Sequence, residues 1–360
     1  MILRTQNTNN TTVEPNKSSP SAINPTMLSE FDKQWKQYCK NYKRLPSRLG
    51  PQKRIIVIGD IHGDWDVLLE FLDRAKVINK NNPDIWIGGV TKVVQVGDQI
   101  DSRNRFNNNY LEKYSDIKIL KYLTKLHSEA EKTGGAIYSL LGNHELMNVV
   151  GDFRYVSDKS LHDLDTETKY DNIEDGRTER KRLFEPGNEL SNFLACTRQV
   201  AIIIGNNLFV HGGIVPIISK QYNITDINRL MTLYLWNVLH NKKDIDDYKT
   251  IFMNPDDSPL WTRRFGMLGY QSTNQTNYSS ECDTLMRPLL EMYSVGKIFV
   301  GHTVVSKSIT TGCKDSIYYV DTGASHAMQD DNIKTSNGER MVIPGAKIVE
   351  IIDDNIYNIL

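Results

Sequence analysis

Five places in this sequence combine side chains that could bind metal ions or transfer protons. In chain order they are Asp60 with His62, Asp98 with Asp101, the run Asn143-His144-Glu145, His211, and His302. Carboxylate, imidazole and amide ligands without a thiolate suit Mn, Fe, Zn or Mg rather than a cysteine-rich structural zinc site. So many candidate ligands exceed what one ion requires. Two ions about 3.5–4 Å apart, bridged by a carboxylate and a hydroxide, would use them, and such a centre suits in-line hydrolysis of a phosphate ester.

Each group taken alone has an ordinary structural explanation. Asp98 and Asp101 can cap a helix, and a lone histidine at a strand end more often has a structural role than a metal-binding one. The interpretation therefore rests on the whole set. Four of the eight histidines fall at the ends of just five apolar runs, and independent structural reasons for all of them are improbable.

The elements that must position these residues are short apolar runs, each ending in a polar cluster. The runs cover 55–64, 93–101, 137–145, 207–213 and 297–303. Four or five apolar residues bounded by glycine predict a strand that is buried on both faces. Helical patterns lie between some of them, at 66–76 and 111–132, so the chain is predicted to have an α/β core. Ligands bind beyond the carboxyl ends of the strands in such cores.

The remaining segments set the domain boundaries. Residues 1–28 are rich in Asn, Thr, Ser and Pro, which predicts a disordered polar tail, and a short amphipathic helix is expected over 27–42. Residues 29–360 form a single catalytic domain in this interpretation. The charged stretch 157–190 is predicted to be an exposed insertion, and the C-terminal strands are expected to complete a second sheet.

Composition excludes several classes of protein. The 360 residues are 39% hydrophobic and 24% charged, with a formal net charge of −1, so there is no basic surface for non-specific nucleic-acid binding. No apolar run approaches the length of a membrane span, and the N-terminus lacks a secretory pattern. The four cysteines are far apart, which argues against a disulfide scaffold. We therefore expect a soluble, reduced, intracellular protein, most simply a cytoplasmic one, without nucleic-acid or membrane partners.

The ordered motifs resemble those of the metallophosphoesterases, and more narrowly the phosphoprotein phosphatase (PPP) family. They are GDIHGD (59–64), GDQID (97–101), GNHE (142–145), HGG (211–213) and GHT (301–303). The strings LLGNHELMNVVGDFRYVS (140–157), PLWTRR (259–264) and DTGAS (321–325) are similar to the Shewanella-like, or bacterial-type, branch. The resemblance covers roughly residues 53–325. It implies the metallophosphoesterase fold: two mixed β-sheets packed as a sandwich, flanked by helices, with a dimetal site at the carboxyl ends of the strands.

The resemblance also implies a role for each motif residue. Two divalent ions would be held by Asp60 and His62 on the first, Asp98 bridging both, and Asn143, His211 and His302 on the second. A hydroxide shared by the ions would attack phosphorus. His144 would act as the general acid that protonates the leaving oxygen, oriented by Asp101, and Glu145 would support its loop. Manganese is favoured, with iron, zinc or magnesium as alternatives.

Arginines are expected to hold the phosphate, because the guanidinium fork matches its oxygens. The segment 259–264 supplies Arg263 and Arg264, and Arg154 is a weaker candidate. The sequence departs from the PPP pattern at Ser102, where the family has arginine. Arg103 follows immediately and is a candidate to replace it.

These residues predict a metal-dependent phosphomonoesterase, with a phosphoprotein (Ser/Thr or Tyr) or a phosphorylated small molecule as substrate. A nucleotide hydrolase, such as a diadenosine tetraphosphatase, shares the five motifs. Its extra phosphate contacts would come from the basic residues of the insertion, which are Arg177, Arg180, Lys181 and Arg182. A non-catalytic scaffold is the third alternative, with Ser102 as its only support. The sequence does not indicate regulatory subunits.

Overall fold

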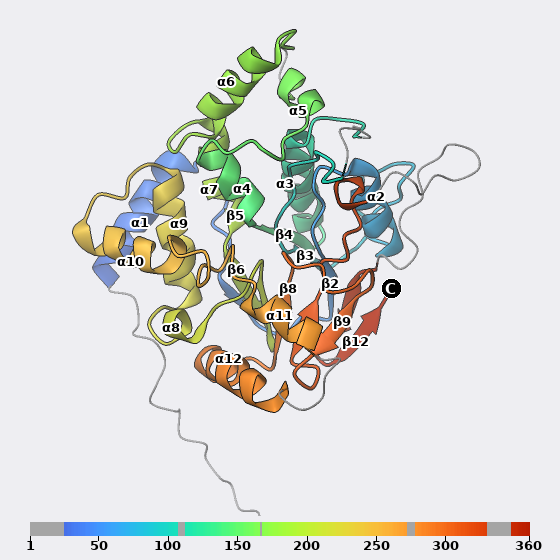
Figure 1. The fold of residues 1–360 in the computed structure, drawn as a ribbon, viewed down its shortest axis with the longest axis vertical. Coiled ribbons are helices and arrows are strands. Elements are labelled where there is room, and N and C mark those ends of the chain that lie inside the picture. Colours follow the sequence, from blue (N-terminus) through green and yellow to red (C-terminus); the bar gives the residue numbers. More distant parts are fainter. Residues whose placement is uncertain (1–24, 107–111, 166–167, 272–277, 330–346) are drawn as a thin grey trace, which may run out of the picture.

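The computed structural model describes residues 25–106, 112–165, 168–271, 278–329 and 347–360. Its centre is a pair of six-stranded sheets (Figure 1). The first sheet has the strand order β12-β11-β2-β3-β4-β5, and the second has the order β1-β6-β7-β8-β10-β9. Each sheet contains both parallel and antiparallel pairs. The predicted architecture of two mixed sheets is confirmed.

The strands of both sheets are short. In the first sheet they are β2 (Arg54–Ile58), β3 (Lys92–Gln95), β4 (Ala136–Leu140), β5 (Arg198–Gln199), β11 (Val349–Ile352) and β12 (Ile356–Ile359). In the second sheet they are β1 (Arg48–Leu49), β6 (Ala201–Ile204), β7 (Asn207–Val210), β8 (Lys297–Val300), β9 (Thr310–Gly312) and β10 (Ile317–Tyr319). The C-terminal hairpin of β11 and β12 joins the first sheet, beside β2. The expectation that the C-terminal strands complete a second sheet is therefore confirmed for β10, which pairs with β8, and wrong for β11 and β12.

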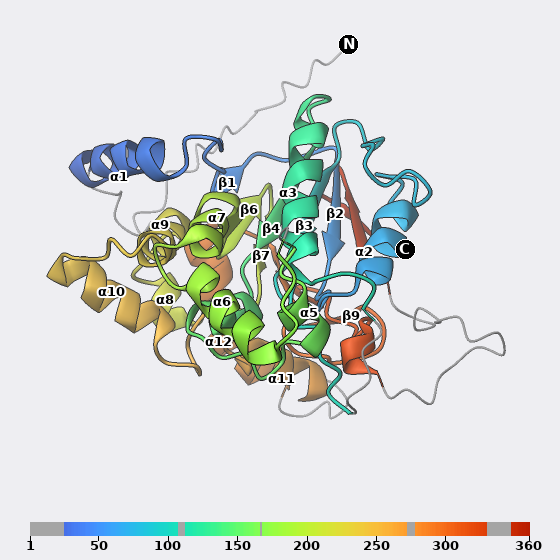
Figure 2. The ribbon, with the colours of Figure 1, turned by 90° about the horizontal axis from the view of Figure 1, so that it is seen from above.

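The apolar runs are continuous because both faces of each central strand are covered. Ile55 and Val57 of β2 pack against the second sheet, in a cluster that contains Phe209 and Phe299. Ile56 and Ile58 point the other way, into a cluster with the apolar side chains of α2 (Trp65–Arg74) and α3 (Ile117–Glu131). Figure 2 shows α2 and α3 on the outer side of the first sheet. The alternation of side chains along a strand thus builds two layers of core from one run.

Helices cover the outer face of the second sheet and one end of the molecule. The first is α1 (Pro25–Tyr38), so residues 25–28 lie in a helix rather than in the predicted tail; residues 1–24 are outside the described part. The others are α7 (Glu189–Thr197), α8 (Pro216–Ser219), α9 (Ile224–Leu235), α10 (Lys242–Phe252), α11 (Arg264–Gln271) and α12 (Tyr278–Tyr293). Within the described residues, none of the helices is long and apolar enough to cross a membrane.

The insertion is folded and partly buried. It contains α5 (Asp158–His162) and α6 (Ile173–Phe184), which pack together beside α4 (Asn143–Val149) (Figure 1). On α6, Leu183 and Phe184 join the main core, and Arg180 is completely buried. The prediction of an exposed insertion therefore holds for the outer face of α6 and for the described residues just before it, but not for the buried face of α6.

All four cysteines are paired in disulfides. Cys39, just after α1, bonds to Cys196 of α7, and Cys282 of α12 bonds to Cys313, just after β9. The expectation of a reduced protein is wrong for this structure. These bonds were not predictable from cysteine spacing, because the partners are 157 and 31 residues apart in the chain.

Removing either disulfide should destabilise the protein, because each bond restricts the unfolded chain. The chain-entropy model gives roughly 5 kcal/mol for Cys39→Ser/Cys196→Ser and roughly 4 kcal/mol for Cys282→Ser/Cys313→Ser as upper values. Urea unfolding of both pair variants measures the loss. A reductant should destabilise the natural chain but not a variant without cysteines. Four titratable thiols in the unreduced, unfolded protein would contradict the pairing.

Candidate metal and phosphate site

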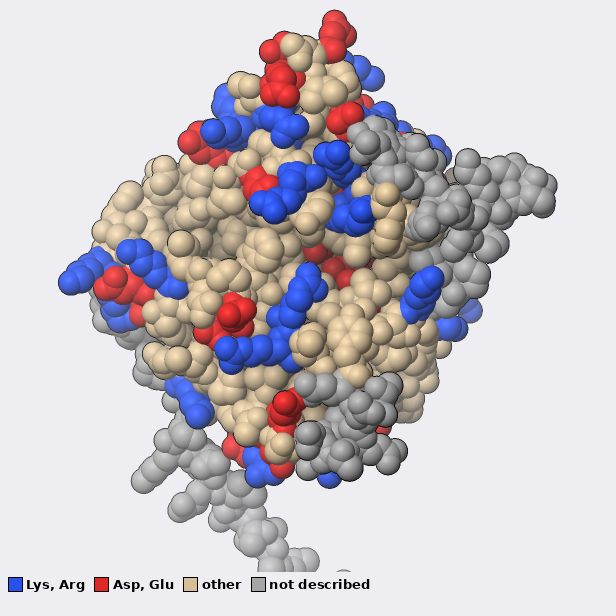
Figure 3. Space-filling view, in the orientation of Figure 1, with Lys and Arg blue, Asp and Glu red and all other residues tan. Residues whose placement is uncertain are grey.

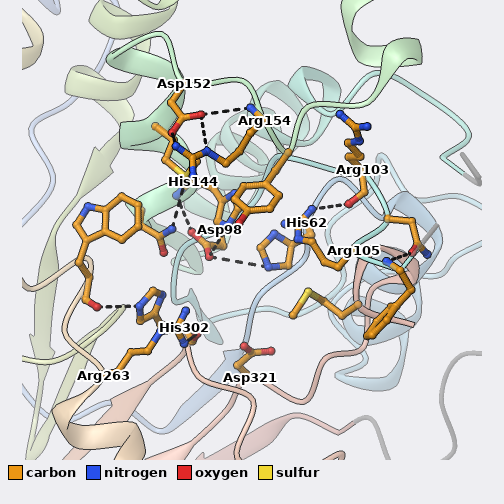
Figure 4. A pocket seen from close by; sticks show the side chains of 17 residues that line it. His62, Asp98, Arg103, Arg105, His144, Asp152, Arg154, Arg263, His302 and Asp321 are labelled. Atoms are coloured by element: carbon orange, nitrogen blue, oxygen red, sulfur yellow. Dashed lines mark hydrogen bonds and ion pairs between the residues drawn. The ribbon is translucent and has the colours of Figure 1, made fainter. Parts of the chain in front are cut away.

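The predicted ligands come from five strand ends that face one another. Asp60 and His62 follow β2, Asp98 follows β3, and Asn143 begins α4 after β4. His211 and His302 follow β7 and β8 of the second sheet. Because β2, β3 and β4 are parallel neighbours, and β7 and β8 are as well, their carboxyl ends bring the ligands to one place. Figure 4 shows His62, Asp98, His144, His302 and Asp321 around a common centre.

The carboxylate of Asp98 lies at that centre. Its Oδ2 atom is 3.2 Å from Nε2 of His211, 3.8 Å from Nε2 of His144 and 3.9 Å from Nε2 of His62. Its Oδ1 atom accepts a hydrogen bond from the backbone N–H of His144 at 3.0 Å. The ligand atoms form two sets, His62–Asp98–His144 and Asp98–His211–His302, each with all its atoms within 4.8 Å of one another. Asp98 belongs to both sets, as a bridging ligand would.

Backbone carbonyls fix the orientation of the imidazoles. Nδ1 of His62 donates to the carbonyl of Ile100, and Nδ1 of His211 donates to that of Val96, so both rings present Nε2 to Asp98. His302 is turned around, because its Nε2 donates to the carbonyl of Trp261 and Nδ1 is left for the site. Such second-shell hydrogen bonds set the tautomer of a metal-binding histidine.

The backbone at this edge is held in an uncommon conformation. His62, Asp98, Asp101 and His302 all have positive φ, at 45°, 53°, 73° and 65°. The left-handed region costs an L-residue roughly 1–2 kcal/mol. Residues in such conformations persist where the surrounding structure holds them, typically at functional sites. The strand ends therefore bend sharply to aim these side chains inward.

Asp60 has a carboxylate oxygen that is available to bind a cation. Its Oδ2 accepts the backbone N–H of His302 at 3.0 Å, whereas its buried Oδ1 has no hydrogen-bond partner among the described residues. A Cβ atom on Gly301 would lie only 2.3 Å from Oδ1, so glycine is required there. Burial, together with the charges of Asp321 and Asp98, raises the pKa of Asp60 well above its usual value. A divalent ion would relieve this concentration of negative charge, and the residues present fit one.

The pKa values of two predicted imidazole ligands, His62 and His302, favour metal binding. Burial lowers the pKa of His62 well below its usual value and lowers that of His302 to about 3. Both rings are therefore neutral, which is the form that binds a metal ion. Burial also acts to lower the pKa of His211, but the charge of Asp98 and its hydrogen bond to His211 outweigh burial and raise that pKa. Burial alone would raise the pKa of Asp98, but the charges of His211 and His144 hold it well below the usual range. Asp98 is thus an ionised carboxylate.

His144 forms a buried pair with Asp101. Its Nδ1 lies 2.6 Å from Oδ2 of Asp101, and its ring faces the cavity. Burial lowers the pKa of His144, but the charge of Asp98 and the contact with Asp101 outweigh burial, so that the net pKa is raised. The pair has the geometry of an oriented general acid.

Glu145 organises the loops that carry the ligands. Its carboxylate accepts backbone N–H groups of Gly142 at 2.7 Å, Asp98 at 3.0 Å and Gln99 at 2.7 Å. One side chain thus joins the loop after β3 to the loop after β4. Glu145 points away from the cavity, in the supporting role that the sequence favoured.

A cavity of about 800 Å³ opens above these residues. In Figure 3 it is the hollow with carboxylates at its floor and basic side chains around its rim. Of the predicted arginines, Arg103, Arg154 and Arg263 line it, and Arg263 also donates to the carbonyl of His302 at 2.8 Å. Arg154 pairs with Asp152 of the same rim. Arg264 does not line it and pairs with Asp257 at 3.1 Å.

Ser102 stands where the PPP pattern has arginine, and its surroundings show which way a side chain at this position points. Its side chain is completely buried, and its hydroxyl is 3.1 Å from that of Ser157, the residue that caps α5. Position 102 therefore faces the insertion rather than the cavity. Arg103, one residue later, faces the cavity, as its candidacy requires.

Sequence reasoning missed three charged residues of the cavity: Asp152, which pairs with Arg154 at the rim, Arg105 and Asp321. Arg105 stacks its guanidinium 4.2 Å above the ring of Tyr155 and donates to backbone carbonyls of Asp101 and Arg103. Asp321 lines the cavity beside Asp60. The DTGAS string marked Asp321 as part of the resemblance without giving it a function. Arg105 had no signal beyond its closeness to Ser102.

A family model described as calcineurin-like phosphoesterase matches residues 53–306. The chain belongs to the calcineurin-like phosphoesterase family. It is accordingly a hydrolase of phosphate esters, and the family implies divalent metal ions at the site just described. The predicted metallophosphoesterase fold and the resemblance to Shewanella-like phosphatases are confirmed as well.

This phosphoesterase is similar to three other proteins over most of their length. It is 30% identical to an uncharacterised protein, R398, of Acanthamoeba polyphaga mimivirus, over 66% of this chain and 97% of that one. It is 26% identical to Shewanella-like protein phosphatase 2 of Arabidopsis thaliana, over 87% and 82% of the two chains. It is 29% identical to Shewanella-like protein phosphatase 1 of Plasmodium berghei, over 87% and 78%.

Solved structures share the phosphoesterase fold. The cold-active protein-tyrosine phosphatase of a psychrophilic Shewanella species superimposes with a TM-score of 0.60 at 24% identity, covering 88% of this chain and 83% of that one. This likeness supports the two-sheet architecture.

Replacing the shared carboxylate should abolish metal binding. Asp98→Asn removes the charge common to both ligand sets, so we expect Mn²⁺ affinity to fall more than about 100-fold, measured by isothermal titration calorimetry. Asp152→Asn, on the cavity rim, is the matched control and should bind Mn²⁺ as the natural chain does. Equal affinity in Asp98→Asn would place the ions elsewhere.

Proposed function

We propose that this phosphoesterase is a metal-dependent protein phosphatase that removes phosphate from phosphorylated side chains. The observation that supports it best is the convergence of both sets of candidate ligand atoms on Asp98, in an arginine-lined cavity. His144 belongs to the first set by position, but its Nδ1 is paired with Asp101, and in this proposal it is the proton donor rather than a metal ligand. The names of the Arabidopsis and Plasmodium relatives agree with this function.

Six residues would hold two divalent ions, of which manganese is favoured. The residues are Asp60, His62, Asp98, Asn143, His211 and His302, all buried. When bound, such ions neutralise phosphate charge and lower the pKa of a water molecule. Their identity follows from availability, because this ligand set also accepts iron, zinc or magnesium.

The chain's own residues would bind the phosphate and supply the proton. Arg103, Arg105 and Arg263 offer guanidinium groups along the cavity wall for the phosphate oxygens. His144 would donate its Nε2 proton to the leaving oxygen, because Nδ1 is engaged by Asp101 and Nε2 faces the site. Asp101 would hold the ring in that orientation and stabilise its protonated form.

The cavity favours phosphotyrosine among protein substrates. Its wall includes the aromatic side chains of Tyr155, Trp261 and Phe106, and Phe106 is 65% exposed at the rim. A phenyl ring entering the cavity would find aromatic neighbours there, whereas a serine phosphate would leave them uncovered. The solved relative with the same fold is named as a tyrosine phosphatase.

The nucleotide hydrolase is the weaker alternative. Its extra phosphate contacts were expected from the insertion, yet Arg180 is buried, Arg177 pairs with Glu174 and Arg182 pairs with Glu179. These arginines do not line the cavity in the described part of the chain.

The disulfides also bear on the cellular location that we propose for this protein. The sequence favoured the cytoplasm, but disulfides persist mainly in oxidising compartments. The two disulfides support a location, or a stage of the protein's life, outside the reducing cytosol.

Activity tests separate the two candidate functions and the role of His144. With Mn²⁺, the protein should hydrolyse a phosphotyrosyl peptide faster than a phosphoseryl peptide or diadenosine tetraphosphate, with Asp98→Asn as the blank. His144→Asn should lower kcat by about 10²–10⁴-fold, the contribution of a general acid, with unchanged Mn²⁺ binding in calorimetry. Preference for the dinucleotide would overturn the protein-phosphatase proposal.

Loss of either cavity arginine should weaken phosphate binding. A charge-assisted hydrogen bond contributes about 1.5–3 kcal/mol, so Arg103→Ala and Arg105→Ala should each raise KM for a phosphotyrosyl peptide by roughly tenfold or more. Arg182→Ala, on the outer face of α6, is the control and should leave KM unchanged. An unchanged KM in both cavity variants would assign phosphate binding to Arg263.

A further inference from the structure

Behind the His144–Asp101 pair lies a second layer of buried polar groups. Its members are Asp116 at the start of α3, Asn148 of α4 and Arg180 of α6, and each is fully buried. Together they link the insertion to the loop after β3 that carries Asp101. The layer is closed to the cavity, so it cannot touch a substrate.

Arg180 is the centre of this layer. Its Nη1 and Nη2 atoms donate to the two oxygens of Asp116 at 2.9 and 3.0 Å. Its Nε donates to Oδ1 of Asn148 at 2.7 Å, and Nη2 lies 3.9 Å from Oδ1 of Asp101. A fixed guanidinium fork is the one side chain that can engage these three neighbours at once.

Asn148 and Asp116 in turn hold Asp101. The Nδ2 atom of Asn148 donates to Oδ1 of Asp101 at 2.8 Å and to the carbonyl of His144 at 2.9 Å. Oδ2 of Asp116 accepts the backbone N–H of Asp101 at 3.0 Å. These contacts fix Oδ1 and the backbone of Asp101, so that only Oδ2 is left to face His144 at 2.6 Å.

The buried charges explain why the position of Asp101 depends on Arg180. Asp101 and Asp116 are fully buried neighbours, joined by the hydrogen bond from the backbone of Asp101. A buried carboxylate without a counter-charge is strongly unfavourable. Arg180 is the cation that faces both. Without it, Asp101 would lose Asn148 as a fixed neighbour and would be repelled by Asp116, so the side chain that orients His144 would no longer have one position.

We propose that Arg180 is a positioning residue for the general acid, acting through Asn148, Asp116 and Asp101 on His144. This inference rests on the proposed function, because it assigns Arg180 to the proton transfer made by His144. The insertion then serves the active site from behind, instead of recognising a substrate at the surface.

The test uses the dependence of rate on the leaving group. A proton donor matters most when the leaving oxygen is a strong base, as in phenyl phosphate, and least for p-nitrophenyl phosphate. Arg180→Lys keeps the charge but loses the fork. We expect it to lower kcat for phenyl phosphate about tenfold or more, to change kcat for p-nitrophenyl phosphate much less, and to leave KM and Mn²⁺ affinity unchanged.

Combining Arg180→Lys with His144→Asn distinguishes a positioning role of Arg180 from a general loss of structure. In His144→Asn the general acid is absent, so adding Arg180→Lys should cause no further loss for either ester. Arg177→Lys, on the same helix but half-buried and paired with Glu174, is the matched control and should match the natural chain. An equal loss for both esters, repeated in the His144→Asn background, would overturn the inference and leave Arg180 a structural residue.

Further variants guard against misfolding and against failure of the underlying proposal. If Arg180→Lys does not fold, Arg180→Gln/Asp116→Asn removes both buried charges together and should show the same leaving-group dependence; its absence would contradict the inference. If His144→Asn itself shows no leaving-group dependence, His144 is not the general acid, and both its proposed role and the positioning role of Arg180 fail. If His144→Asn shows it and the Arg180 variants do not, only the positioning role fails.

Discussion

The rest of the structure depends on how the negative charge buried beneath the cavity is stabilised. Carboxylates of the site are taken out of water, where each needs a cation or several hydrogen-bond donors. Three different solutions are used within a few residues of one another. Asp98 has imidazoles and the place for metal ions, Asp116 has the guanidinium of Arg180, and Glu145 has backbone N–H groups.

The hydrogen bonds that Glu145 accepts explain why the geometry at the metal site is fixed before any ion binds. Its carboxylate holds the backbone of Asp98 and Gln99 on one loop and that of Gly142 on the next. Asn143 follows Gly142, so two ligands from different strands are placed relative to each other by one side chain. Burial and the charge of Asp98 raise the pKa of Glu145 to about 6, and protonation would weaken the acceptance of these N–H groups by one of its two oxygens.

How far the sequence predicted the site depended on whether the signal was local. The ligands were predictable, because each follows a short apolar run within a few residues, and parallel strands bring their ends together. The pairing of β11 with β2 and the disulfide of Cys39 with Cys196 were not, since both join segments far apart in the chain. Arg180 was hidden for another reason: α6 is so charged that no apolar face distinguishes a buried arginine from its exposed neighbours.

The departure at Ser102 and the buried insertion are two aspects of one arrangement. The position where the resembling family carries its phosphate-binding arginine points here at Ser157, the cap of α5, and the serine at that position is fully buried. The loop thus gives up a cavity contact in order to pack the insertion. That packing brings α6 close enough for Arg180 to reach Asp116. Arginine is consequently found on both sides of the loop, at the cavity wall as Arg103 and behind it as Arg180, where the charge stabilises the general-acid pair instead of the substrate.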